Sequence, residues 1–283
     1  MVQPPLCAQD GKPDLTGFAR VDWQAPWLAP IAQAGQAVWA DWTAHGGALC
    51  DSLNRHLSAP VAFVRQDALG VQMPYEAHVA RLGQVPTRDN VHDFFNALIW
   101  STWPETKSQI NRLHAAEIAA QTGAAGPRGA TRDGLTLLDE NGAALVAPTE
   151  LWRALEAHDW HTAFVAKRAL WAQSYLWLFG HALLEQLAQP RKGLTAHVWL
   201  LDSATNQWAI DALASGQDIC SLQRALDKRW SKTLTAKSVA AKPFTPLPVL
   251  GVPHWWAANE EADFYADSSV FRPPRQRRRP ASS

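Results

Sequence analysis

The residues best suited to chemistry lie around two histidines, His92 and His114. Asp93 follows the first histidine directly, and a histidine beside a carboxylate can act as a general base or help to hold a divalent metal. We therefore take His92, Asp93 and His114 as candidate catalytic residues. Their spacing matches no known metal signature such as H-E-x-x-H, so the residue types alone carry this prediction.

Polar residues near these histidines are candidates for ligand binding. Asn96 lies four residues after His92, and Asn111 lies three residues before His114, so each pair shares a helix face. A short connection makes the two predicted helices neighbours, and both sets can converge on a pocket between them. The candidate binding residues are Asn96, Trp100, Lys107, Asn111 and Glu185.

A second ionisable pair, His181 and Glu185, stands four residues apart in a stretch that we predict to be a buried helix. Burying ionisable groups is costly unless they are paired. If this end of the stretch packs against the first cluster, His92, His114 and His181 become candidate metal ligands. The predicted cofactor is then a divalent metal.

The same residues also have a structural interpretation. Asn90 can cap a helix, and a carboxylate at Asp93 is stabilised by the helix dipole. Asn96, Asn111 and His114 can satisfy buried backbone groups where the two helices connect. The sequence contains no G-x-S-x-G elbow, phosphate loop or dinucleotide fingerprint, so serine-nucleophile, P-loop and Rossmann chemistry lack support.

Composition indicates a folded protein with many buried indoles. Hydrophobic residues make up 47% of the 283, and Trp occurs 15 times against 3 Tyr.

Residues 272–283 contain five arginines and no acid, which leaves 21 basic and 26 acidic residues in the rest of the chain. A body of that sign has no broad basic surface, so nucleic acid binding would depend on the tail.

Cysteine usage and the absence of targeting signals predict a cytoplasmic protein. Cys7, Cys50 and Cys220 are odd in number and widely spaced, which suggests no disulfide framework. The chain begins without a secretory signal. The longest charge-free stretch, residues 169–184, is shorter than a membrane span requires, so we predict no membrane association.

The predicted elements give a predominantly helical α+β fold. We expect a strand at 61–65, helices at about 74–82, 90–103 and 104–121, a β-hairpin at 135–146 turning at Asn141-Gly142, a helical region at 159–190 and a central strand at 194–202. Residues 1–271 should form a single domain with a proline-rich N-terminal arm, and 272–283 a disordered basic tail. The best linker candidate is 122–131, which is rich in Gly and Ala.

Several segments together resemble a known bacterial family. They are residues 85–100, Lys107 with the segment 111–114, residues 132–142, 180–185 and 192–197, and the ending formed by 248–253, Phe264-Tyr265 and 270–273. This set is similar to the domain-of-unknown-function family DUF3025. The resemblance covers most of the chain and implies a single domain, and it implies no catalytic residues.

Two classes of function remain open from the sequence. The first is a metal-assisted hydrolase that binds a small molecule in a polar His/Asp/Asn pocket between helices. The second is a non-enzymatic ligand-binding or protein-interaction module that uses its tryptophan-rich surface and arginine-rich tail. A converging set of His92, Asp93 and His114 would favour the first class, and an exposed aromatic patch would favour the second.

Overall fold

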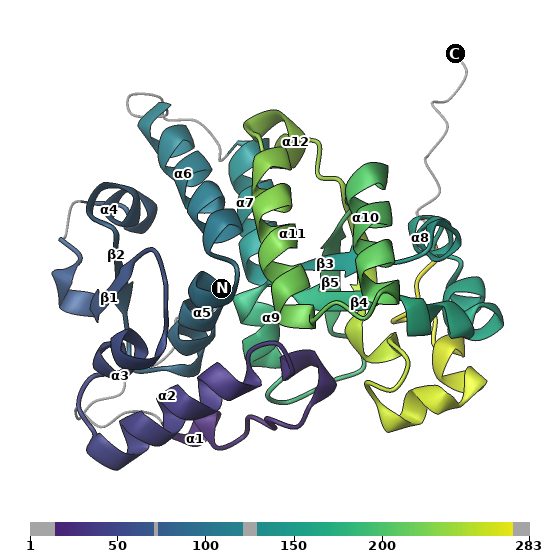
Figure 1. The fold of residues 1–283 in the computed structure, drawn as a ribbon, viewed down its shortest axis with the longest axis horizontal. Helices are drawn as coiled ribbons and strands as arrows, with labels where there is room; N and C mark the ends of the chain where they lie inside the picture. The colour runs from purple at the N-terminus through teal and green to yellow at the C-terminus, as the bar shows by residue number, and fades with distance from the viewer. Residues whose placement is uncertain (1–14, 71–72, 121–128, 274–283) are drawn as a thin grey trace.

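The computed structural model describes residues 15–70, 73–120 and 129–273, in which helices surround a four-stranded sheet (Figure 1). Buried hydrophobic side chains form one continuous core that runs from Phe18 near the N-terminus to Phe271 near the C-terminus. The fold is therefore the predicted predominantly helical α+β single domain.

The N-terminal part combines helices with a small parallel sheet. Gly83 ends α4 in the left-handed conformation, with φ of 64°, which a residue without a Cβ adopts at no steric cost. The chain then returns as β2 beside β1. The elements are α1 (Leu15–Phe18), α2 (Ala32–His45), α3 (Leu49–His56), β1 (Ala62–Arg65), α4 (Tyr75–Leu82) and β2 (Gln84–Thr87).

Three helices follow: α5 (Val91–Thr102), α6 (Pro104–Ala120) and α7 (Ala130–Asn141). Most of α5 is buried, which explains the apolar run from Phe94 to Trp100 that only Asn96 interrupts. Pro104 starts α6 at a position where a missing N–H costs nothing. The N–H groups of Glu105 and Thr106 donate to the carboxylate of Asp227, at 2.9 and 2.8 Å, and this contact fixes the start of α6 against α11.

The central sheet has the strand order β4-β3-β5-β6. Its strands are β3 (Gly142–Val146), β4 (Tyr175–Leu178), β5 (Thr195–Trp199) and β6 (Phe244–Pro248). β3 and β5 are parallel, and the two outer strands run antiparallel to their neighbours. The expected strand at 194–202 is thus confirmed as a central strand, and the prolines of β6 lie on an edge strand, where proline is tolerated.

The remaining helices cover the sheet and the polar end of the core. They are α8 (Thr149–Glu156), α9 (His181–Gln186), α10 (Ser203–Ala214), α11 (Ile219–Thr233) and α12 (Ala236–Ala240). Figure 1 shows α10 and α11 in front of the sheet and α9 between the sheet and α5. This arrangement places the ends of α5, α7 and α9 beside one another.

The predicted β-hairpin at 135–146 is wrong. Its first half is the C-terminal part of α7, and only the second half is a strand, β3. Gly142 has φ of −72°, so the Asn-Gly pair forms no type I′ turn. Close packing accounts for this glycine instead, because a Cβ there would lie 2.2 Å from the carbonyl oxygen of Leu138.

The predicted helical region at 159–190 is also wrong as a continuous element. A π-helical turn (Thr162–Ala166) and a 3-10 segment (Arg168–Gln173) precede β4, and α9 begins only at His181. The reason is tertiary: β4 supplies the hydrogen-bonding partner for the outer edge of β3. Its Trp177 packs edge-on against Trp103 of the α5–α6 junction.

Parts of two predictions lie outside the described residues. The expected linker falls mainly on 121–128, and all but Arg272 and Pro273 of the predicted tail falls on 274–283. Within the described ranges, no helix combines the length and apolar character needed to cross a bilayer.

Candidate functional site

A cavity of about 460 Å³ lies between α4, α5, α6, α7 and α9. It gathers eight of the nine predicted site residues, and the ninth, Glu185, contacts His92 at its edge. The predicted convergence of the two clusters is therefore present, while the roles of the residues remain predictions. The predicted residues in its wall are His92, Asp93, Asn96, Trp100, Lys107, Asn111, His114 and His181.

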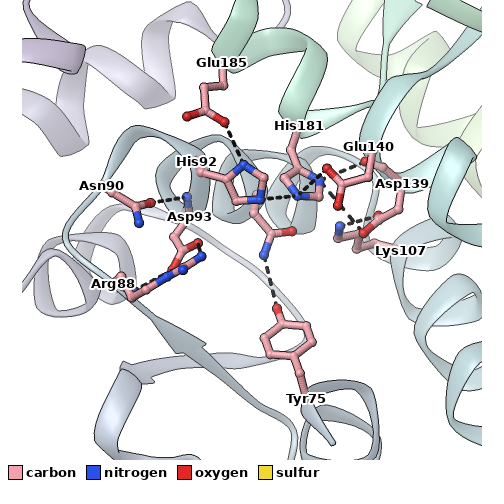
Figure 2. Close-up of polar contacts among 11 residues, drawn as sticks. Tyr75, Arg88, Asn90, His92, Asp93, Lys107, Asp139, Glu140, His181 and Glu185 are labelled. Atoms are coloured by element: carbon pink, nitrogen blue, oxygen red, sulfur yellow. Dashed lines mark hydrogen bonds and ion pairs between the residues drawn. The ribbon is translucent and has the colours of Figure 1, made fainter. Parts of the chain in front are cut away.

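Two histidine rings from different helices face each other in this cavity. The Nε2 atoms of His92 on α5 and His181 on α9 are 3.1 Å apart (Figure 2). On its other side, the ring of His92 contacts Glu185, with 2.7 Å between Nδ1 and Oε2. The Nδ1 atom of His181 lies 2.8 Å from the backbone carbonyl oxygen of Asp139.

These partners determine where the ring protons lie. A carboxylate and a carbonyl oxygen only accept hydrogen bonds, so both rings carry a proton on Nδ1. In a neutral imidazole the Nε2 atom is then a bare lone pair. Burial lowers the pKa of His181 to about 3, which keeps this ring neutral near pH 7. Two lone pairs at 3.1 Å repel each other unless a cation lies between them.

Glu140 completes a group of three potential metal ligands with these rings. Its Oε2 atom is 3.6 Å from Nε2 of His181. The sheet register explains the contact. Antiparallel β3 and β4 pair Ala143 with Leu178, and Glu140 precedes Ala143 by three residues while His181 follows Leu178 by three residues. The pairing of the strands thus sets the end of α7 against the start of α9.

The triad of His92, Glu140 and His181 has the dimensions of a metal site. One potential ligand atom from each residue lies within 4.8 Å of the others. Two nitrogen ligands of a tetrahedral zinc ion are about 3.3 Å apart, close to the observed Nε2 separation. Each histidine also donates its Nδ1–H to an oxygen, the arrangement that commonly orients metal-bound histidine.

His114 was predicted as a metal ligand together with His92 and His181. The structure places it in the wall of the same cavity, buried, but outside the triad. Glu140 takes the position that the sequence interpretation gave to His114. The physical reason is that the β3–β4 pairing sets the end of α7, which carries Glu140, against the start of α9.

A buried ion pair lies beside the triad. The ammonium group of Lys107 on α6 binds the carboxylate of Asp139, and only 5% of the Lys107 side chain is exposed. Burial opposes ionisation of Asp139, but Lys107 and His181 beside it hold the pKa of its carboxyl below the ordinary value. Asp139 thus neutralises Lys107 with its side chain and orients His181 with its backbone.

Asp93 was predicted to be catalytic, and its surroundings do not support that role. Its two oxygens accept hydrogen bonds from Arg88: 3.0 Å from Nε, 2.9 Å from Nη2 and 2.6 Å from the backbone N–H. Its own N–H donates to Asn90, which caps α5 as the structural interpretation expected. Figure 2 shows this pair on the opposite side of His92 from Glu140. Asp93 positions Arg88.

The predicted amides and the indole line the cavity walls. The Nδ2 group of Asn96 donates to the hydroxyl of Tyr75 at 3.2 Å, and that of Asn111 donates to the carbonyl of Glu76 at 3.2 Å. Among the described residues, the buried Oδ1 of Asn96 and Nε1 of Trp100 have no hydrogen-bond partner. Buried polar atoms are usually paired, so this wall is incomplete as a purely structural element.

Among the residues of the site that sequence reasoning missed are Tyr75, Arg88, Asp139 and Glu140. Asp139 and Glu140 fall within the hairpin predicted at 135–146, directly before its expected turn at Asn141-Gly142. The signal that could have found them is the spacing of Leu135 and Leu138, which suits a helix whose next turn carries both carboxylates.

Comparisons with known proteins identify the family. Residues 61–275 match the family described as protein of unknown function (DUF3025), and this range contains every residue of the cavity wall. Searches of curated proteins and of solved structures return no match. Since the family match covers well over half of the 283 residues, the chain belongs to the DUF3025 family.

Proposed function

We propose that this protein is a metal-dependent hydrolase in which His92, His181 and Glu140 hold one divalent ion, most suitably zinc. The observation that carries the proposal is the pair of Nε2 atoms 3.1 Å apart, each on a ring whose Nδ1–H donates to an oxygen. A metal ion between these atoms turns a repulsive contact into two bonds.

A proton is the rival occupant of this position. The hydrogen bond to Glu185 raises the pKa of His92, and a protonated His92 would donate from Nε2 to His181. The negative charge of Glu140 also raises the pKa of His92, so this carboxylate is compatible with either occupant. The metal is favoured by the geometry of the three residues together, because one potential ligand atom from each lies within 4.8 Å of the others.

Three protein ligands leave a position of a four-coordinate ion open, as in catalytic rather than structural zinc sites. A divalent ion there would polarise a substrate carbonyl or phosphoryl group and favour ionisation of a nearby water molecule. Glu185 and the backbone carbonyl of Asp139 fix the orientation of the two histidine rings. His114, in the same wall, transfers protons to or from the reacting group.

The cavity suits a small molecule. Its volume of about 460 Å³ falls within the usual range for ligand pockets, and apolar Leu69, Pro86 and Ile110 share the wall with the polar groups.

We also propose that the protein is cytoplasmic, because the two described cysteines, Cys50 and Cys220, are free thiols.

The test compares zinc-loaded, chelator-treated and metal-restored full-length protein on a panel of chromogenic esters, amides and phosphate esters. We expect hydrolysis that chelation abolishes and zinc restores, and that His92→Ala lacks. Matched activity of His92→Ala and wild type would contradict the proposal. Stoichiometric zinc with no turnover on a broad panel would instead support the non-enzymatic ligand-binding module.

A further inference from the structure

We infer that the cavity recognises substrates that carry an oxyanion group, a carboxylate or a phosphate, and that Arg88 binds this group. The inference rests on the proposed metal site and names the class of substrate that the site would take. It follows from the position of Arg88, from how its guanidinium is held and from the donors left over.

Arg88 is the cation of the cavity wall that a ligand can reach. Of the two lysine and arginine residues in the described part of that wall, Lys107 is only 5% exposed and is bound by Asp139. The Arg88 side chain is 56% exposed, at the rim. An incoming anion would therefore meet the guanidinium of Arg88.

The guanidinium is already held in place. Asp93, whose side chain is 9% exposed, accepts hydrogen bonds from Nε and Nη2 and also from the Arg88 backbone N–H. An arginine fixed in this way loses little conformational freedom when it binds a ligand. Asp93 thus holds the planar guanidinium of Arg88 in one orientation.

Donors remain for a ligand after Asp93 is satisfied. A guanidinium has five N–H groups, and Asp93 takes one from Nε and one from Nη2. Within the described ranges, no other residue accepts a hydrogen bond from this guanidinium, and Nη1 makes none. Two neighbouring N–H groups on one edge suit the two oxygens of a carboxylate or phosphate.

The position of Arg88 relative to the triad sets the layout of the substrate. Arg88 precedes α5 and His92 lies in its first turn, and Figure 2 shows the Arg88–Asp93 pair and Glu140 on opposite sides of His92. A substrate would place its reacting group at the triad and its anionic group several bonds away. Glu76 is a carboxylate in the same wall, so the alternative to test is a substrate whose ammonium group binds Glu76.

Hydroxamates test this layout, because the hydroxamate end binds zinc and the other end can be varied. Binding to zinc-loaded full-length protein is measured by calorimetry for alkyl hydroxamates that end in methyl, carboxylate, phosphonate or ammonium, with two to four methylenes between the ends. We expect a carboxylate or phosphonate end to tighten binding roughly tenfold or more over methyl at the best length. The better of the two identifies the anion.

Variants assign the gain to Arg88. Arg88→Gln should remove it and leave binding of the methyl compound unchanged, and Arg88→Lys should keep a part of it. The double variant Arg88→Gln/Asp93→Asn, which leaves no orphaned buried carboxylate, should behave like Arg88→Gln. Arg55 is a matched control, because it is 49% exposed and also donates from Nε and Nη2 to an aspartate, to a single oxygen of Asp41. Arg55→Gln should retain the full gain.

Three results would overturn the inference: an anionic end that gives no gain, a gain that survives in Arg88→Gln, or tighter binding of the ammonium compound. The third would favour Glu76 as the recognition residue. If the methyl hydroxamate itself fails to bind zinc-loaded protein, the metal site is contradicted and the inference falls with it. The methyl compound thus separates failure of the metal site from failure of the anion site.

Discussion

Two partly buried polar clusters in this molecule differ in how their polar groups are paired. Around Arg168, the guanidinium donates to Asn259, Tyr265 and Glu260 at 2.9–3.2 Å. Asn259 in turn donates to two backbone carbonyls. Around His92 and His181, by contrast, the two Nε2 atoms face each other at 3.1 Å, and two neutral rings that both carry their proton on Nδ1 have none to place between them.

The difference separates a structural cluster from a site. In the first cluster both Nη groups of Arg168 donate to protein acceptors, and aromatic rings pack around it: Phe164 stacks on Tyr265 with 5.0 Å between ring centroids. These contacts form without a ligand. The histidine cluster has surplus acceptors and adjoins a cavity, so a cation is needed to complete it. The following changes test this contrast, from the largest expected effect to the smallest.

Phe164→Ala should damage the structural cluster alone. Phe164 is fully buried and also stacks on Trp171, with 5.5 Å between centroids. Its truncation leaves a cavity and should lower the free energy of unfolding by about 3–5 kcal/mol, measured by urea denaturation of chelator-treated protein. Zinc content of the folded variant should equal that of wild type. Loss of zinc in that sample would show that the two clusters are coupled.

Lys107→Met should lower the stability of the fold next to the cavity. It leaves the carboxylate of Asp139 without its cation in a buried position, which should cost about 2–4 kcal/mol in urea denaturation. The double variant Lys107→Met/Asp139→Asn removes the uncompensated charge and should regain much of that loss. A double variant less stable than Lys107→Met would contradict the assigned pairing.

Glu185→Gln should weaken metal binding with little effect on folding. Glu185 is 43% exposed, and its carboxylate accepts the Nδ1–H of His92. Loss of such an outer partner typically lowers metal affinity about 10–100-fold, which competition with a chromogenic chelator can measure. Glu150→Gln, at an exposed carboxylate paired with Lys167, is the control and should bind zinc like wild type.

Asp267→Asn should give the smallest effect, and one that depends on pH. Hydrogen bonds from Ser269, and then the ammonium of Lys192, lower the pKa of Asp267 to about 2 from 3.8. A carboxylate with a lowered folded-state pKa stabilises the fold above pH 3.8, and this contribution is lost as the pH falls toward 2. The difference in melting temperature from wild type should therefore shrink over that interval. A constant difference would exclude the ionised carboxylate as its cause.

Local signals in the sequence were sufficient for the helices around the cavity but not for the triad of His92, Glu140 and His181. The Asn90 cap, Pro104 and the short α5–α6 connection predicted that the residues on these two helices would converge, and they line one cavity. Glu140 could not be placed, because Asn141-Gly142 mimics a hairpin turn that tertiary packing overrides.

Long-range pairing accounts for the rest. His181 starts a helix only because β4 interrupts the apolar stretch before it, and β4 forms because β3 needs a partner. That pairing, between residues 29 to 35 positions apart, also sets Glu140 beside His181. No helical or strand periodicity within either segment contains this information.

The zinc content of purified full-length protein tests the central claim most directly. Wild type, His92→Ala and the control His45→Ala, at a histidine 71% exposed on α2, are saturated with zinc, dialysed and measured by elemental analysis. We predict about one zinc per chain in wild type and His45→Ala, and less than about a tenth of that in His92→Ala. Folded wild type that retains no zinc, and no manganese or iron in parallel samples, would leave a proton between His92 and His181 and contradict the account.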